Sequence, residues 1–171
     1  PWCNGRVGML GVSYLAISQY KVAALHPPAL KAICPWEGFT DAYRDFCTSG
    51  GVVENGFARV WLFVSSRVAR LRTNLAAERG RHPLRDEWWD AITPDLSKIT
   101  VPILECVSFS DANLHSAGSM RAFQRVSSEH RHAYTHRGPK WAVFYGEEAR
   151  RSQLAFFDRH LRGKDAPELP R

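Results

Sequence analysis

Three side chains far apart in the sequence have the types that acyl transfer by a serine requires. Ser13 follows a short apolar run, Asp111 lies in a polar loop after a second run, and His136 lies in a loop after a third. We predict a strand before each of them, so parallel pairing would bring all three to one rim of a sheet. There a serine hydroxyl attacks an ester or amide carbonyl, a histidine accepts its proton, and an aspartate orients the imidazole.

The stretch around Ser13 predicts a sharp turn from a strand into a helix. Residues 7–12 form an apolar run typical of a fully buried strand, and residues 14–25 carry apolar side chains at helical spacing. Such a turn needs small residues where its backbone nearly touches the helix, and Gly11 supplies one. The second glycine of the usual G-x-S-x-G pattern is replaced by Leu15, which leaves Ala16 as the neighbouring small residue.

The other elements predict an α/β fold with a mainly parallel sheet and flanking helices. The first strand, its helix and a second strand form one βαβ unit. The chain order serine, acid, histidine is the order found in α/β hydrolases. The further predicted elements are strands at 30–34, 101–107 and 131–134 and helices at 114–126 and 147–161.

Residues 37–98 lack a strand pattern and predict a helical cap inserted between two strands. Helix-like pieces cover 40–46, 55–72 and 84–92, and the middle piece has apolar side chains on one face. An insertion at this point would lie over the carboxyl ends of the strands, where ligands bind in open α/β folds. Trp61 on this insertion is a candidate for a substrate pocket, with helix packing as the alternative.

Several segments resemble a known family of enzymes. The sequence is similar to serine hydrolases of the cocaine esterase and Xaa-Pro dipeptidyl-peptidase type over nearly its whole length. The resemblance implies a partial α/β-hydrolase fold in which Ser13 is the nucleophile, Asp111 the acid and His136 the base. The segments that carry it are PWCNGRVGMLGVSYLA, ICPWEGFTDAYRDF, SFSDANLHSAGS, and THRGPKW followed by QLAFFDRHLRG.

The resemblance also implies how the chain is divided. We expect the second half of a hydrolase domain with its cap, and a jelly-roll domain beyond the chain. The oxyanion hole would combine the backbone N–H of Tyr14 with a tyrosine hydroxyl from a loop upstream of Pro1. The expected parts are the elbow unit at 1–36, the cap at 37–98, the rest of the hydrolase domain at 99–163, and a linker at 164–171.

The residues leave alternatives open for the histidine and the acid. His115 is a rival base, four residues after Asp111, but it is expected inside a helix instead of on a loop. Glu37 and Asp41 are rival acids, because they follow the second strand. Asp111 has the further alternative of capping the helix that begins near residue 114. A non-catalytic remnant that serves in binding or assembly is the alternative function.

The substrate is expected to be a small neutral ester or amide with a bulky apolar group. Family members that recognise a free amine tend to carry extra carboxylates after the catalytic acid, whereas this sequence has Ala112 and Asn113 there. Besides Trp61, the candidate pocket residues are Trp36 and Trp141. No cofactor or metal is expected.

Composition excludes several other classes of protein. The 171 residues, 44% of them hydrophobic, can bury a core, and no apolar run has the length of a membrane span. The net charge of +6 is spread among acidic residues, which favours a solvated surface over nucleic-acid binding. Four cysteines without C-x-x-C spacing predict reduced thiols. We therefore expect a soluble, cytoplasmic protein without nucleic-acid or membrane partners, and leave open a homo-oligomer.

Overall fold

The computed structural model describes residues 3–70, 72–167 and 169. The chain divides into two compact units. Pro1–Thr40 and Pro94–Arg171 form one, here called the sheet unit, and Asp41–Thr93 form the other, called the inserted unit. The inserted unit falls within the predicted insertion at 37–98. Among the described residues, no helix has the length and apolar character that crossing a membrane requires.

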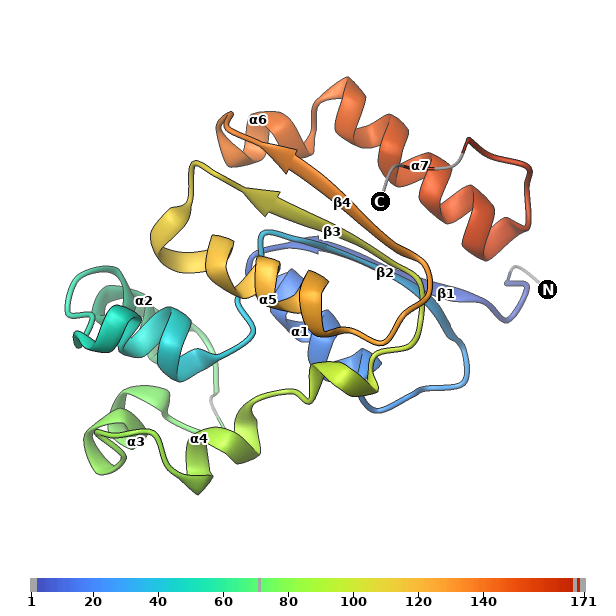
Figure 1. Ribbon diagram of the computed structural model, residues 1–171. Helices are drawn as coiled ribbons and strands as arrows, with labels where there is room; N and C mark the ends of the chain where they lie inside the picture. The colour runs from blue at the N-terminus through green and yellow to red at the C-terminus, as the bar shows by residue number, and fades with distance from the viewer. Residues whose placement is uncertain (1–2, 71, 168, 170–171) are drawn as a thin grey trace. The chain divides into compact units, whose positions relative to one another are not determined.

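The sheet unit is built on four parallel strands in the order β1-β2-β3-β4 (Figure 1). At the carboxyl ends, Val12 pairs with Trp36, Trp36 with Cys106, and Ser108 with His136. The residues that follow the strands therefore share one rim of the sheet. The strands are β1 (Val7–Val12), β2 (Leu30–Trp36), β3 (Ile103–Ser108) and β4 (Arg131–His136).

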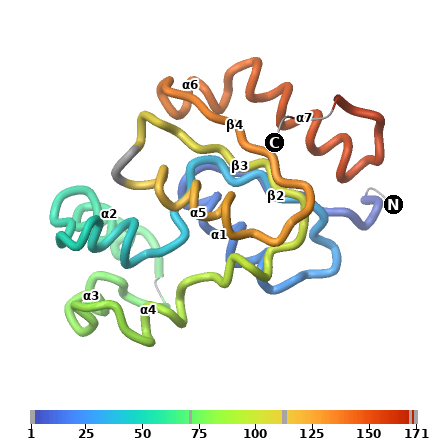
Figure 2. Tube along the Cα trace, viewed as in Figure 1, coloured from blue at the N-terminus to red at the C-terminus, as the bar shows by residue number. Residues whose placement is uncertain are grey.

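Helices cover both faces of this sheet (Figure 2). On one face, α1 (Tyr14–Ala23) and α5 (Ala117–Arg125) bury Tyr20 and Ala122 against Ile33 and Ile103. On the other face, Phe156 of α7 (Glu147–Arg162) packs with Trp36 and Leu104. The short helix α6 (Lys140–Phe144) precedes α7. Two short helices, η3 (Leu96–Lys98) and η4 (Ala112–Ser116), flank β3.

The inserted unit is helical, as the sequence predicts for this region. An aspartate or asparagine side chain caps three of its helices: Asp41 before η1, Asn74 before α3 and Asp86 before α4. Its helices are η1 (Ala42–Cys47), η2 (Ser49–Gly51), α2 (Phe57–Val68), α3 (Leu75–Arg81) and α4 (Glu87–Ile92). Its role as a cap stays a prediction.

Three details of the sheet differ from the sequence prediction. The run at 7–12 is not fully buried, because β1 is the edge strand of the described sheet, with Val7 and Leu10 exposed. β2 continues through Pro35 to Trp36. β4 continues to His136, which belongs to a strand instead of a loop. This last difference changes where the histidine side chain points.

Candidate active site

Ser13 lies on the sharp turn that the sequence predicts. It lies between β1 and α1 with φ of 58° and ψ of −114°, a backbone conformation that residues with a Cβ rarely adopt. A Cβ built on Gly11 would lie closer to the Leu15 Cβ than the 3.0 Å that real Cβ atoms keep. Glycine is therefore required at position 11 for the helix to begin directly after Ser13.

The backbone around Ser13 is held by the neighbouring strand. The Ser13 N–H donates to the Trp36 carbonyl at 3.0 Å. Tyr14 is the first residue of α1, so its N–H is one of those that a helix leaves without an intrahelical acceptor. This N–H has the position in the chain that the predicted oxyanion donor requires.

The histidine that contacts Ser13 is His115. The Ser13 Oγ lies 3.1 Å from His115 Nε2, and His115 Nδ1 lies 2.5 Å from Asp111 Oδ2. With the Nδ1 hydrogen directed at Asp111, Nε2 presents its lone pair to the serine hydroxyl. A serine hydroxyl, an imidazole and a carboxylate thus lie one after another within hydrogen-bond distance, which is the arrangement that a catalytic triad requires.

A wide helical turn brings Asp111 and His115 together. Asp111 immediately precedes η4, a π-helical turn, and His115 lies four residues later, on the same side of that turn. The His115 ring is 2% exposed and stacks on Phe39, with ring centroids 6.4 Å apart. The spacing D-x-x-x-H was the signal for this pair in the sequence. The prediction placed His115 inside a regular helix and so ranked it below His136.

Asp111 is held in its charged form. Burial raises the pKa of this carboxyl, but hydrogen bonds from His115 and Lys140, together with their charges, outweigh burial and lower the pKa to about 2. Asp111 is therefore ionised at neutral pH and can stabilise an imidazolium on His115.

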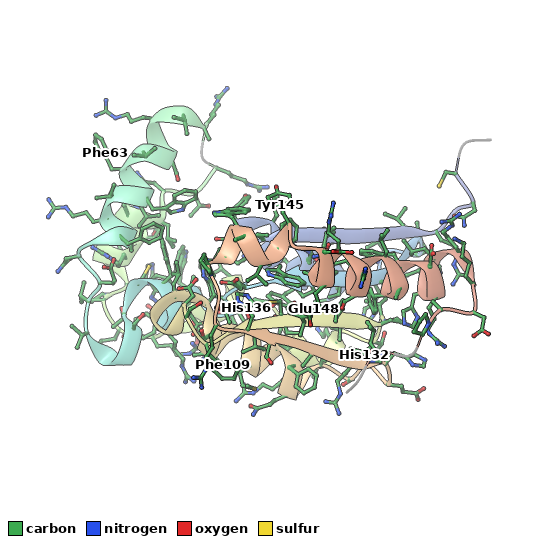
Figure 3. All side chains as sticks on the ribbon, turned by 90° about the horizontal axis from the view of Figure 1, so that it is seen from above. Phe63, Phe109, His132, His136, Tyr145 and Glu148 are labelled. Carbon is green, nitrogen blue, oxygen red and sulfur yellow. The ribbon has the colours of Figure 1, made fainter. Side chains whose placement is uncertain are left out.

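The structure pairs His136 with Glu37, not with Ser13. His136 Nε2 lies 3.0 Å from Glu37 Oε1. His136 Nδ1 has no hydrogen-bond partner among the described residues. Figure 3 labels His136 at the same end of the sheet as Phe109, whose N–H donates to the His136 carbonyl at 2.8 Å. The sequence prediction that His136 serves Ser13 does not match this geometry.

The cause is the strand itself. Because β4 includes His136, strand alternation puts this side chain on the same face as Tyr134, and both rings contact Trp36. Glu37 follows Trp36 directly, is fully buried and has a φ of 53°. His115 and Glu37, the two rivals that the sequence left open, therefore both contact the predicted residues. The side chains of Ser13, Glu37, Asp111, His115 and His136 are here called the rim cluster. Asp41, the other rival acid, belongs to the inserted unit and caps η1.

Lys140 joins the two histidine–carboxylate pairs. Its Nζ donates to Asp111 Oδ2 at 2.6 Å and forms an ion pair with Glu37 Oε2 at 3.4 Å. Glu37, Asp111 and His115 lie close enough to share a cation, but this ammonium already lies against both carboxylates. Cys106 is also near Glu37 and His136; burial is the main cause that raises the pKa of its thiol, which disfavours the thiolate that metals bind. These features favour an acid–base cluster over a metal centre.

Of the three tryptophans predicted to line a pocket, Trp36 lies in the core instead. Its ring is fully buried in the sheet unit, with centroids 4.9 Å from Tyr134 and 5.6 Å from Phe144, so it packs the core and presents no surface to a ligand. Trp141 is exposed on α6, next to Lys140, and Trp61 is exposed on α2 of the inserted unit. Their role as pocket walls stays a prediction.

The parallel sheet, the strained serine turn and the rim cluster define a protein of the α/β-hydrolase class. The chain belongs to the X-Pro dipeptidyl-peptidase (S15) family, which it matches over residues 1–140. The family resemblance seen in the sequence is thereby confirmed.

Individual relatives are longer than this chain. The cocaine esterase of Rhodococcus sp. (strain MB1 Bresler) is 49% identical over 43 residues, covering 25% of this chain and 8% of that protein. A putative serine esterase of Mycobacterium bovis is 36% identical over 61 residues, covering 36% of this chain and 10% of that protein. A CocE/NonD family hydrolase from Staphylococcus aureus superposes with a TM-score of 0.92 at 38% identity, covering 97% of this chain and 31% of that chain. The chain therefore spans about a third of the solved relative.

Proposed function

We propose that this chain carries the reacting groups of a serine hydrolase that cleaves an ester or amide through an acyl-serine intermediate. The observation that carries the proposal is the continuous contact from Ser13 through His115 to Asp111. Family membership supports a hydrolase of the esterase or peptidase type. The role of base is assigned to His115 in place of His136.

In the first half of the reaction, Ser13 Oγ attacks the carbonyl carbon while His115 Nε2 accepts the hydroxyl proton. The carbonyl oxygen becomes an oxyanion, which the Tyr14 N–H stabilises. His115 then gives the proton to the leaving alcohol or amine, and the acyl group stays on Ser13. In the second half, His115 Nε2 takes a proton from a water molecule as that water attacks the acyl carbon, and then gives the proton to Ser13 Oγ as the acyl–oxygen bond breaks and the acid leaves.

An ester is favoured over a peptide as substrate. Two of the relatives carry names that describe esterases, one of them cocaine esterase. In the sheet unit, Trp141 follows Lys140 directly in α6 and its side chain is exposed, so it stays the candidate that would hold a bulky apolar group. Of the two substrate types expected from the sequence, a neutral ester with such a group is therefore the one proposed.

Labelling with a fluorophosphonate tests the proposed function. We expect mass spectrometry to find one adduct, on the peptide that contains Ser13, and to find none in Ser13→Ala. A folded chain that takes no label contradicts the proposal and supports the alternative of a binding or assembly module.

A further inference from the structure

Lys140 has the contacts of a side chain that controls the charge of the cluster. It is the first residue of α6, and its Nζ lies 2.6 Å from Asp111 Oδ2, 3.4 Å from Glu37 Oε2 and 3.1 Å from His115 Nδ1. Its side chain is 22% exposed, so water only partly screens these interactions.

The two carboxylates of the rim cluster, Glu37 and Asp111, require a positive charge close to them. Glu37 is fully buried and Asp111 is three-quarters buried, and the two carboxylates have ligand atoms within 4.8 Å of each other and of His115. Two carboxylates this close together stabilise the charged form of any nearby group that can become a cation. Among the described residues in contact with these two carboxylates, the groups besides Lys140 that can do so are the imidazoles of His115 and His136. An imidazolium at His115 has no lone pair and cannot accept the Ser13 proton.

We propose that Lys140 is a positioning residue whose ammonium supplies the positive charge shared by Asp111 and Glu37, so that the His115 imidazole stays available as the base. This inference rests on the proposed function, in which His115 is the base that accepts the Ser13 proton. The ammonium is a permanent cation at neutral pH, whereas the imidazole changes its charge during the reaction.

The other groups around His115 and the two carboxylates do not replace this charge. Phe39 covers one side of the ring, and the Ser13 hydroxyl lies against Nε2. On β3, burial keeps the Cys106 thiol uncharged by raising its pKa. His136, at the end of β4, is directed at Glu37 Oε1. Among these described contacts, Lys140 therefore supplies the permanent positive charge.

The test measures the protonation of His115 directly. The chain is labelled with ¹⁵N in its histidines, and the pH midpoint of the His115 ring is followed by NMR, with His115→Gln used for assignment. In Lys140→Met, we expect this midpoint to rise by roughly one to two pH units, the usual effect of changing a neighbouring charge. Lys140→Arg should stay close to the unchanged chain because it keeps the charge. Lys98→Met is the matched control, since that lysine is exposed and pairs with Asp95 at 3.8 Å.

Equal midpoints in Lys140→Met and the unchanged chain would overturn the inference. If Lys140→Met does not fold, Glu37→Gln gives the complementary measurement. It removes one negative charge beside His115, so the midpoint should fall, and an unchanged or raised midpoint contradicts the proposal. The NMR measurement does not depend on turnover. A Lys140-dependent midpoint in a chain that takes no fluorophosphonate would therefore refute the proposed function while leaving the electrostatic role of Lys140 in place.

Discussion

Gly11→Ala tests whether the turn at Ser13 depends on the close approach of β1 to α1. The added Cβ would lie within 3.0 Å of the Leu15 Cβ, and its next neighbours are the Leu15 backbone atoms at 3.4 Å. Leu15 belongs to the first turn of α1, so the helix itself must move. Overpacking of this kind costs about 1–3 kcal/mol in the free energy of unfolding. For a chain of this size that corresponds to a fall in Tm of about 2–12 °C.

Thermal unfolding followed by circular dichroism measures this effect. Gly80→Ala is the matched control: Gly80 lies in α3 with open space around it, so alanine should raise stability by about 0.5–1 kcal/mol. Gly11→Ala should also slow fluorophosphonate labelling of Ser13, because the serine moves with the helix. In Gly11→Ala combined with Leu15→Gly, the nearest obstacle is gone, and labelling should recover. A Gly11→Ala chain that is as stable and as reactive as the unchanged chain would refute the account of the turn.

Three further changes test the charges and the core. Because the folded-state pKa of Asp111 is about 2, below the unfolded value of about 3.9, its stabilisation is present above pH 5 and lost toward pH 2. The stability difference between the unchanged chain and Asp111→Asn in urea unfolding should therefore shrink on acidification, and a constant difference contradicts this. Burial raises the pKa of Glu105, which accepts a hydrogen bond from the Tyr20 hydroxyl at 2.7 Å. The free energy of unfolding of Glu105→Gln, relative to that of the unchanged chain, should therefore increase from pH 4 to pH 8. A difference that is independent of pH would be evidence against a buried titrating carboxyl. Trp36→Ala should lose about 3–5 kcal/mol of stability as a core residue, and a loss under 1 kcal/mol in thermal unfolding would argue for a pocket role.

Much of the sheet unit follows from local sequence patterns. The apolar runs give each strand to within two residues, and Gly163 ends α7 with a φ of 64°, as expected of a helix C-terminus. The elements without a periodic signal, α3 and α6, were not predicted, because short helices depend on capping and packing more than on amphipathicity. The predicted linker at 164–171 lies partly outside the described residues.

The histidine shows where reasoning from the sequence stops. Ser13 and Asp111 were predicted from turn and loop chemistry, and the structure brings both to one ring. To decide between His115 and His136, the last residue of β4 must be known to within one residue. A strand that includes His136 directs its side chain toward Trp36 and Glu37. The decision also requires the π-helical form of η4, which no propensity scale predicts. Lys140 had no signal of its own, since its three contacts come from parts of the chain far apart in sequence.

The rate at which Ser13 takes a fluorophosphonate, compared between His115→Ala and His136→Ala, tests the central claim most directly. Loss of a general base typically costs about 10²–10⁴ in rate. If His115 is the base, His115→Ala should label at least about 10²-fold more slowly, whereas His136→Ala should keep most of the original rate. Slow labelling of His136→Ala together with normal labelling of His115→Ala would contradict the assignment and return the role of base to His136.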